Sequence, residues 1–200
     1  MRALTLALAL AACGAGGPAV AATYVFEADL NGANEASPNA SPGFGYSRLY
    51  LDTDAHTLRI TAEFQDLIGN TTAAHVHGPT AAPGAGVAAV ATQTPSFVGF
   101  PLGVTAGNWD HTFDTTQTST WNLTFINNNG GTPLGAEAAL LVALEQGRAY
   151  FNIHTEVFPG GEIRGFYAAA VPEPGVWALL IAGFGLAGAA LRRRAVGASA

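Results

Sequence analysis

The stretch that decides the fold is HTLRITAEFQ, residues His56–Gln65. Its apolar and polar side chains alternate without interruption from Leu58 to Phe64. A period of two places successive side chains on opposite faces of an extended chain, and it is typical of a β-strand with one buried face. We therefore expect a half-buried strand here, with Ile60 and Ala62 also facing a core.

The same alternation recurs outside this stretch, most clearly in Tyr24–Leu30. Asn, Gly, Pro, Thr and Ser fill the segments between candidate strands, as turns require. Many short strands with this spacing predict an all-β domain, either a β-sandwich or a Greek-key barrel. The other candidate strands are Phe44–Asp52, Ala73–His77, Val87–Ala91, Thr120–Ile126, Arg148–Thr155 and Glu162–Ala168.

Two segments depart from the strand pattern. Ala136–Gln146 has apolar residues at helical spacing, and Gly147 follows it as a helix-ending residue. We expect one short helix there, over one end of the β domain. Residues 92–118 are rich in Thr, Gly, Pro and Asn, and they predict a long surface loop.

Charge and cysteine content exclude several classes of protein. The chain has 200 residues and a net charge of −6, and all eight of its basic residues are arginines. Between residues 23 and 170, 13 acidic residues face only four arginines, so no basic face is available for nucleic acid. Cys13 is the single cysteine, which excludes an intramolecular disulfide and a cysteine-based zinc site.

The first 22 residues predict a secretory signal peptide. Arg2 is followed by an apolar run, and the small residues Ala19–Ala22 offer a site to signal peptidase. The run is too short and too rich in nearby glycine for a membrane span. A second reading stays open, because Leu10–Cys13 resembles a bacterial lipobox in which Cys13 is lipidated.

The C-terminal end has three parts in a fixed order. The motif Pro172-Glu173-Pro174 comes first, an uncharged run over residues 175–191 follows, and Arg192, Arg193 and Arg194 complete it. The run is long enough for about 25 Å of helix, which predicts a transmembrane helix with the arginines and the tail 195–200 in the cytoplasm. An ordinary single-span anchor explains the helix and the arginines, but not the Pro-Glu-Pro.

This order resembles the PEP-CTERM sorting signal of Gram-negative bacteria. The resemblance implies that an exosortase in the inner membrane recognises the segment 171–194 and cleaves near Pro172–Pro174. The protein would then be anchored in the inner membrane in transit and reach the cell surface or the extracellular space. The resemblance also implies an association with exopolysaccharide.

Three histidines form the most informative pattern in the middle of the chain. On an extended strand His75 and His77 point to one face, and His154 lies on the outer face of another candidate strand. If the two strands pair, the three imidazoles form a candidate copper or zinc site. The alternative is a structural cluster in which each ring donates a hydrogen bond to a carbonyl or a carboxylate such as Glu162. His111 could also reach this site from the predicted long loop.

A second motif follows His154. Pro159, Gly160 and Gly161 predict a tight turn into the next strand. Glu162 and Arg164 lie two residues apart on one face of that strand, where they could pair with each other or with cross-strand partners. We interpret the motif as a structural hairpin with a surface ion pair rather than as a catalytic acid–base pair.

The strings Ala74–Pro79, Gly147–Thr155 and Phe158–Gly165, with an opening at Leu30–Glu35, resemble the CHRD domain, which was first described in chordin and is widespread in secreted bacterial proteins. The resemblance covers residues 23–168. It implies an immunoglobulin-like or superoxide-dismutase-like β fold and no established enzymatic activity. Copper–zinc dismutases place two copper ligands on a His-Val-His strand, but this chain has no counterpart of their zinc loop or disulfide.

The sequence therefore predicts an exported, non-catalytic β domain over residues 23–170, with a structural, adhesive or binding role. Exopolysaccharide and surface proteins are its expected partners, alongside exosortase and signal peptidase. The alternative is a copper- or zinc-binding protein of dismutase-like architecture. We expect no dismutase activity, because a strongly acidic domain repels anionic superoxide.

Overall fold

The computed structural model describes residues 23–170, 179–186 and 188. The predicted signal segment 1–22 with Cys13, the Pro172-Glu173-Pro174 motif, Arg192–Arg194 and the tail 195–200 lie outside the described residues. Residues 179–186 are helical. Within the described ranges no helix is both long and apolar enough to cross a membrane, and the predicted span 175–191 falls partly outside them.

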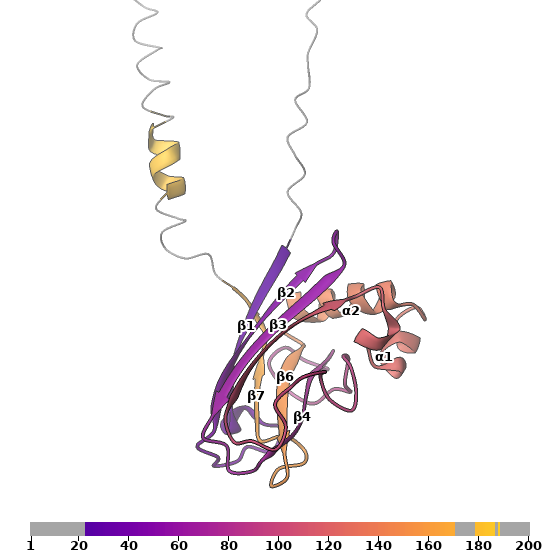
Figure 1. The fold of residues 1–200 in the computed structure, drawn as a ribbon. Coiled ribbons are helices and arrows are strands. Elements are labelled where there is room, and N and C mark those ends of the chain that lie inside the picture. Colours follow the sequence, from indigo (N-terminus) through magenta and orange to yellow (C-terminus); the bar gives the residue numbers. More distant parts are fainter. Residues whose placement is uncertain (1–22, 171–178, 187, 189–200) are drawn as a thin grey trace, which may run out of the picture.

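The β domain is one curled, antiparallel sheet of eight strands (Figure 1). The spatial order is β4-β6-β7-β1-β2-β3-β5, and β8 pairs with β1. The all-β prediction is confirmed, and the strands form one continuous sheet that curls around its core. The strands are β1 (Thr23–Asn31), β2 (Phe44–Asp52), β3 (Thr57–Gln65), β4 (Thr71–His77), β5 (Gly107–Asp114), β6 (Tyr150–Thr155), β7 (Ile163–Phe166) and β8 (Ala168–Ala169).

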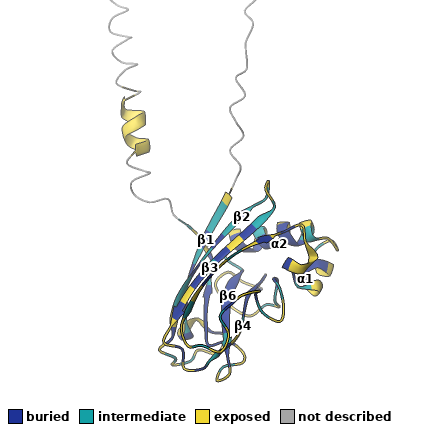
Figure 2. Ribbon diagram, in the orientation of Figure 1, coloured by how far each residue is buried: buried dark blue, intermediate teal, exposed yellow. Residues whose placement is uncertain are grey.

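The core lies inside the curl. The strand predicted at His56–Gln65 is β3, and its residues Leu58, Ile60, Ala62 and Phe64 are buried as the alternation requires (Figure 2). Unbroken register pairs β3 with β2 from Phe44↔Gln65 to Asp52↔Thr57, so the inward faces of both strands coincide. Burial of this shared apolar face is the main force that holds the sheet in its curl.

Two helices lie beside one end of the sheet, where one was expected (Figure 1). The predicted helix is α2 (Pro133–Glu145); the Thr132 side chain accepts a hydrogen bond from the Gly135 amide at its start. The second helix, α1 (Leu123–Asn128), corrects the strand predicted at Thr120–Ile126. Asn122 caps the first turn of α1 through its side chain, and the short 3₁₀ turn η2 (Thr118–Thr120) precedes it. A further 3₁₀ turn, η1 (Gly32–Asn34), follows β1.

Two other predictions about the strands were wrong. Residues 87–91 form no strand and contribute only one isolated bridge, between Val90 and His77. Residues 92–118 are not merely a surface loop, because they contain the edge strand β5 and four buried aromatic side chains. These are Phe97, Phe100, Trp109 and Phe113, which pack into the core.

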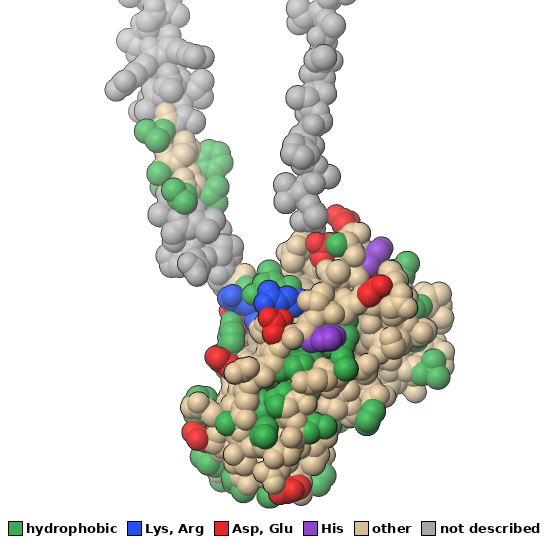
Figure 3. Space-filling model, in the orientation of Figure 1, with side chains coloured by type: hydrophobic (Ala, Val, Ile, Leu, Met, Phe, Trp, Pro, Cys, Tyr) green, Lys and Arg blue, Asp and Glu red, His purple; other side chains and the backbone are tan. Residues whose placement is uncertain are grey.

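The described surface carries few charges, and its arginines are largely paired. Figure 3 shows scattered acidic side chains and one gathering of basic ones. Arg48 binds Glu27, and Arg59 Nη2 lies 2.6 Å from a carboxylate oxygen of Asp110. Both pairs are well exposed, so each contributes little to stability.

Candidate metal centre

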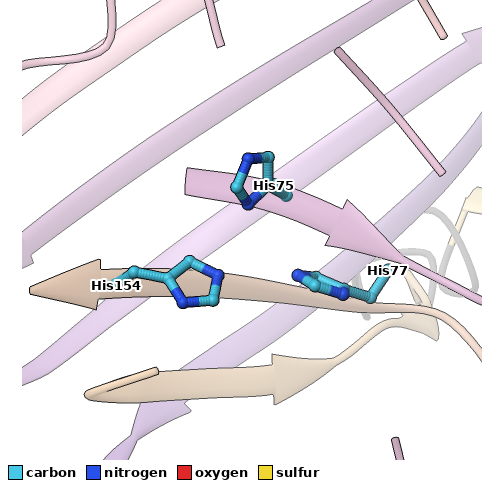
Figure 4. A group of neighbouring side chains, drawn as sticks. All are labelled: His75, His77 and His154. Carbon is cyan, nitrogen blue, oxygen red and sulfur yellow. The ribbon is translucent and has the colours of Figure 1, made fainter. Parts of the chain in front are cut away.

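Three histidines meet on two neighbouring strands (Figure 4). His75 and His77 lie on β4 and His154 on β6, and the antiparallel pairing sets Ala73 opposite His154 and His75 opposite Asn152. The pairing assumed from the sequence is therefore present. Val76 and Ala74 are fully buried in the core, so the three imidazoles point to the other face of the sheet.

The three rings are close enough to share one ion. The ring centroids of His75 and His154 are 5.3 Å apart, those of His75 and His77 5.6 Å, and those of His77 and His154 5.8 Å. Each ring offers one nitrogen as a ligand atom, and these three nitrogens all lie within 4.8 Å of one another. Zn–N bonds of 2.0–2.1 Å in a tetrahedral shell place ligand nitrogens about 3.4 Å apart, so binding would draw the rings inward.

Each ring is fixed through its other nitrogen by a backbone carbonyl. His75 Nε2 lies 2.8 Å from the Pro95 oxygen, His77 Nδ1 3.0 Å from the Ala88 oxygen, and His154 Nδ1 3.0 Å from the Pro159 oxygen. A carbonyl only accepts, so each of these nitrogens carries the proton and the remaining nitrogen presents a lone pair. This is the arrangement that orients histidine ligands around metal ions.

The three remaining nitrogens are buried and have no hydrogen-bond partner within the described part of the chain. They are His75 Nδ1, His77 Nε2 and His154 Nε2. The alternative prediction of a satisfied structural cluster accounts for one nitrogen of each ring but not for the other. Buried polar atoms without partners are rare in folded proteins, and they call for a ligand or a functional explanation.

Burial keeps the rings neutral. Desolvation lowers the pKa of His75 and of His77 to about 4, against a weaker raising effect of their carbonyl hydrogen bonds. Burial lowers the pKa of His154 as well. All three lone pairs are therefore available for coordination at neutral and mildly acidic pH.

The other two histidines are elsewhere. His56 binds the Glu137 carboxylate, with its Nδ1 3.1 Å from each oxygen. His111 lies on β5, its ring edge-on to Phe113 with centroids 4.5 Å apart, so the expectation that it reaches the cluster from a loop is wrong.

A stacked column lies beside the cluster, and sequence reasoning missed its role. The Tyr150 ring is parallel to His77, with centroids 4.9 Å apart. The Arg164 guanidinium lies 4.8 Å from the centre of the Tyr150 ring and 5.3 Å from that of Phe166. Period-two alternation places Tyr150 on the histidine face, but nothing in the pattern shows that a cation stacks on it.

Arg164 is held on its other side by carbonyl groups of two loops and lies close to Glu35. It donates to the Asn34 oxygen and, at 2.9 Å, to the Gly86 oxygen, and its Nε lies 3.7 Å from Glu35 Oε2. Desolvation raises the pKa of Glu35 to about 7, although Arg164 acts to lower it. Glu35 Oε1 and the neighbouring Asn152 Oδ1 are buried and find no hydrogen-bond partner among the residues that the structure describes.

The surface location predicted for an ion pair at Glu162 and Arg164 is wrong, and of the two pairings left open the one between these two residues does not form, since Arg164 lies against Glu35. Both side chains are buried, at 0% and 4% exposure, although Pro159 and Gly160 in the turn before them are exposed. A buried carboxylate is costly unless hydrogen-bond donors satisfy its oxygens, and the donors to Glu162 do not include Arg164. Its carboxylate accepts hydrogen bonds from Ser41, Thr155 and the amides of Ile68 and Gly69.

These features define an all-β domain that gathers three histidine ligand atoms under a loop-covered face of a curled sheet. The CHRD domain profile matches residues 26–167, and the profile of the PEP-CTERM protein-sorting motif matches residues 170–194. The chain therefore belongs to the CHRD domain family and carries a PEP-CTERM sorting signal. It is an exported protein that exosortase processes, with membrane anchoring in transit. No curated protein and no solved structure matches the chain.

Proposed function

We propose that this exported domain binds one transition metal ion, copper or zinc, through His75, His77 and His154. The observation that carries the proposal is the set of three buried, unpartnered ring nitrogens, each on an imidazole whose other nitrogen donates to a backbone carbonyl. The proposed role is binding, and Glu162, the carboxylate that the sequence analysis weighed for acid–base chemistry, is engaged by four hydrogen-bond donors.

The test is elemental analysis of the exported protein purified without a histidine tag. We expect about one copper or zinc per chain, and loss of the metal in the His75→Ala/His77→Ala double variant. His111→Ala is the matched control, because His111 lies on β5 outside the cluster. Absence of copper and zinc, even after reconstitution of the folded protein, would overturn the proposal.

A second candidate, polysaccharide binding at the cell surface, is favoured by a cleft on the outer face of β1, β2, β3 and β5. The cleft has a volume of about 630 Å³. One row of cross-strand neighbours lines it, namely Asp29, Tyr46, Glu63 and Asn108. The half-exposed Phe44 adds an aromatic surface beside these hydrogen-bonding groups, a combination suited to a neutral sugar.

Trp109, Trp121 and Tyr150 are buried, so these aromatic side chains are not available to stack on a sugar. The candidate contacts for a sugar are therefore the residues that line the cleft. Titration with neutral oligosaccharides, followed by tyrosine fluorescence, should show saturable binding that Tyr46→Ala weakens at least tenfold. Equal binding by this variant would exclude the cleft.

A further inference from the structure

The proposed metal centre lacks any counter-charge for a bound ion. Among the described residues the ligand cluster consists of three histidines and no acidic side chain. The charged side chain nearest to this cluster by stacking is Arg164, which lies on the Tyr150 ring that stacks on His77. All three rings are neutral when they coordinate, so the full charge of the ion remains in the site.

A fixed positive charge lies nearby and adds to this cost. Arg164 is 4% exposed and connects to His77 through the Tyr150 ring, which stacks on both. Its acidic neighbour Glu35 is 3.7 Å away and has a pKa of about 7, so it is only partly ionised at neutral pH. The positive charge of Arg164 is therefore only partly compensated beside the proposed cation site.

Burial makes the charge of the ion decisive. His75 and His77 are 7% and 8% exposed, and the three ligand nitrogens are themselves buried. The Born cost of placing an ion in a low-dielectric interior grows with the square of its charge, so a divalent ion pays about four times the cost of a monovalent ion of the same size. Because the ligand set contains no carboxylate, no negative ligand charge offsets the extra cost of burying a divalent ion.

The number of ligands points the same way. Structural zinc takes four protein ligands, and a three-ligand zinc site keeps a water in the fourth position. Here the described residues offer three, on rings held by the carbonyls of Pro95, Ala88 and Pro159. The buried ligand atoms leave little access for a completing water. Three neutral donors in a closed shell suit an ion that accepts three-coordination.

We propose that the site selects monovalent copper, Cu(I), over Cu(II) and Zn(II). This rests on the proposed metal-binding function and names its ligand. Imidazole binds copper and zinc alike, so donor type alone does not discriminate between them. The missing counter-charge, the adjacent guanidinium and the three-coordinate shell supply the selectivity. Ag(I) shares the charge and coordination of Cu(I), so the site binds it as well.

The experiment compares three ions on the full exported chain. Cu(I) affinity is measured anaerobically with ascorbate, by competition with bicinchoninate. Zn(II) and Cu(II) affinities are measured by competition with metal-chelating dyes without reductant. We expect the Cu(I) dissociation constant to be at least a hundredfold lower than that of Zn(II) and lower than that of Cu(II). Ag(I) should displace Cu(I) from the site.

A variant that adds a negative charge beside the histidines tests whether the missing counter-charge causes the preference for Cu(I). Asn152 lies opposite His75 on one side and opposite Arg164 on the other, so Asn152→Asp places a carboxylate beside the cluster with almost no change in shape. We expect the ratio of Cu(I) to Zn(II) affinity to fall at least tenfold. Asn127→Asp, at an exposed position of α1, makes the same chemical change away from both candidate sites and should leave the ratio unchanged.

The outcomes separate the inference from the function beneath it. Tighter binding of Zn(II) or Cu(II) than of Cu(I) by the wild-type chain would overturn the Cu(I) proposal and leave metal binding standing. An unaltered ratio in folded Asn152→Asp would overturn its electrostatic basis. No binding of any of the ions would remove the metal function itself. The wild-type order of affinities needs no variant, so it decides the matter even if Asn152→Asp does not fold.

Discussion

Glu162 and Arg164 are separated by one residue, yet their side chains join different buried networks. Glu162 accepts four hydrogen bonds that tie the 41–43 and 68–69 segments to the end of β6, at distances of 2.6–3.1 Å. Arg164 instead binds the Asn34 and Gly86 carbonyls and stacks on Tyr150. The Glu162 network holds the 41–43 and 68–69 loops in place. The Arg164 network supports the face of the sheet that carries the histidines.

Glu162→Gln should destabilise the domain by about 3 kcal/mol, because the amide of glutamine meets backbone N–H donors that need an acceptor. For a domain of this size that corresponds to roughly 10 °C in Tm. The four donors outweigh burial and hold the pKa of Glu162 below its usual value. Its stabilising effect is thus present above pH 4.5 and lost as the pH falls through the lowered pKa. Thermal unfolding at pH 7 is the measurement, and a Tm within 2 °C of wild type would show that the network is dispensable.

Two adjacent glycines, Gly160 and Gly161, should differ in how much stability they lose on substitution by alanine. Gly161 has a φ of +128°, and a Cβ there would lie 2.5 Å from Asn152 Oδ1 and 2.6 Å from Glu35 Oε1. Gly161→Ala should therefore cost about 2 kcal/mol or more through backbone strain and overlap with buried side chains. Gly160→Ala has open space around its Cβ and should be nearly neutral. Denaturant unfolding of both variants checks this, and equal losses would contradict it.

The sequence predicts the framework of the candidate site but not its completion. Alternation alone places His75, His77 and His154 on one face, because side-chain direction in a strand follows from residue spacing. It does not reveal the carbonyls of Ala88, Pro95 and Pro159, since their positions depend on the path of long loops. Nor does a local pattern mark Glu35, which meets Arg164 from 129 residues away in the chain.

The two misread elements, β5 and α1, each have a physical cause. The edge strand β5 alternates through Trp109, His111 and Phe113, but Gly, Asn, Asp and Thr between them favour turns, and pairing with β3 overrides that preference. The α1 segment is rich in residues that also suit strands, and Asn122 at its start acts as a helix cap. Pairing with β3 therefore determines that β5 is a strand, and the cap at Asn122 favours the helix α1.

The histidine cluster should make the metal-free domain sensitive to acid. The unfolded chain takes up protons on histidines below about pH 6.5, whereas His75 and His77 in the folded state resist protonation until about pH 4. Their contribution to stability is complete above pH 6.5 and is lost as the pH falls towards 4. Thermal scans with a chelator should show a smaller loss of Tm over this window for His75→Gln/His77→Gln than for wild type. Parallel curves for the two proteins would contradict the burial of neutral rings.

Glu35 should act in the opposite direction. Its pKa rises from 4.5 in the unfolded chain to about 7 in the fold, mainly through desolvation, so the folded state holds a proton that the unfolded state has released. Its stabilising effect is present below pH 4.5 and is lost as the pH rises to 7. Glutamine carries no charge at any of these values, so the Tm of Glu35→Gln relative to wild type should rise between pH 4.5 and 7 and then level off. Glu63→Gln, on the exposed outer face, is the matched control for the substitution. A Tm difference for Glu35→Gln that does not change with pH would mean that Arg164 keeps the carboxylate ionised throughout, and that the region beside the histidines holds a negative charge after all.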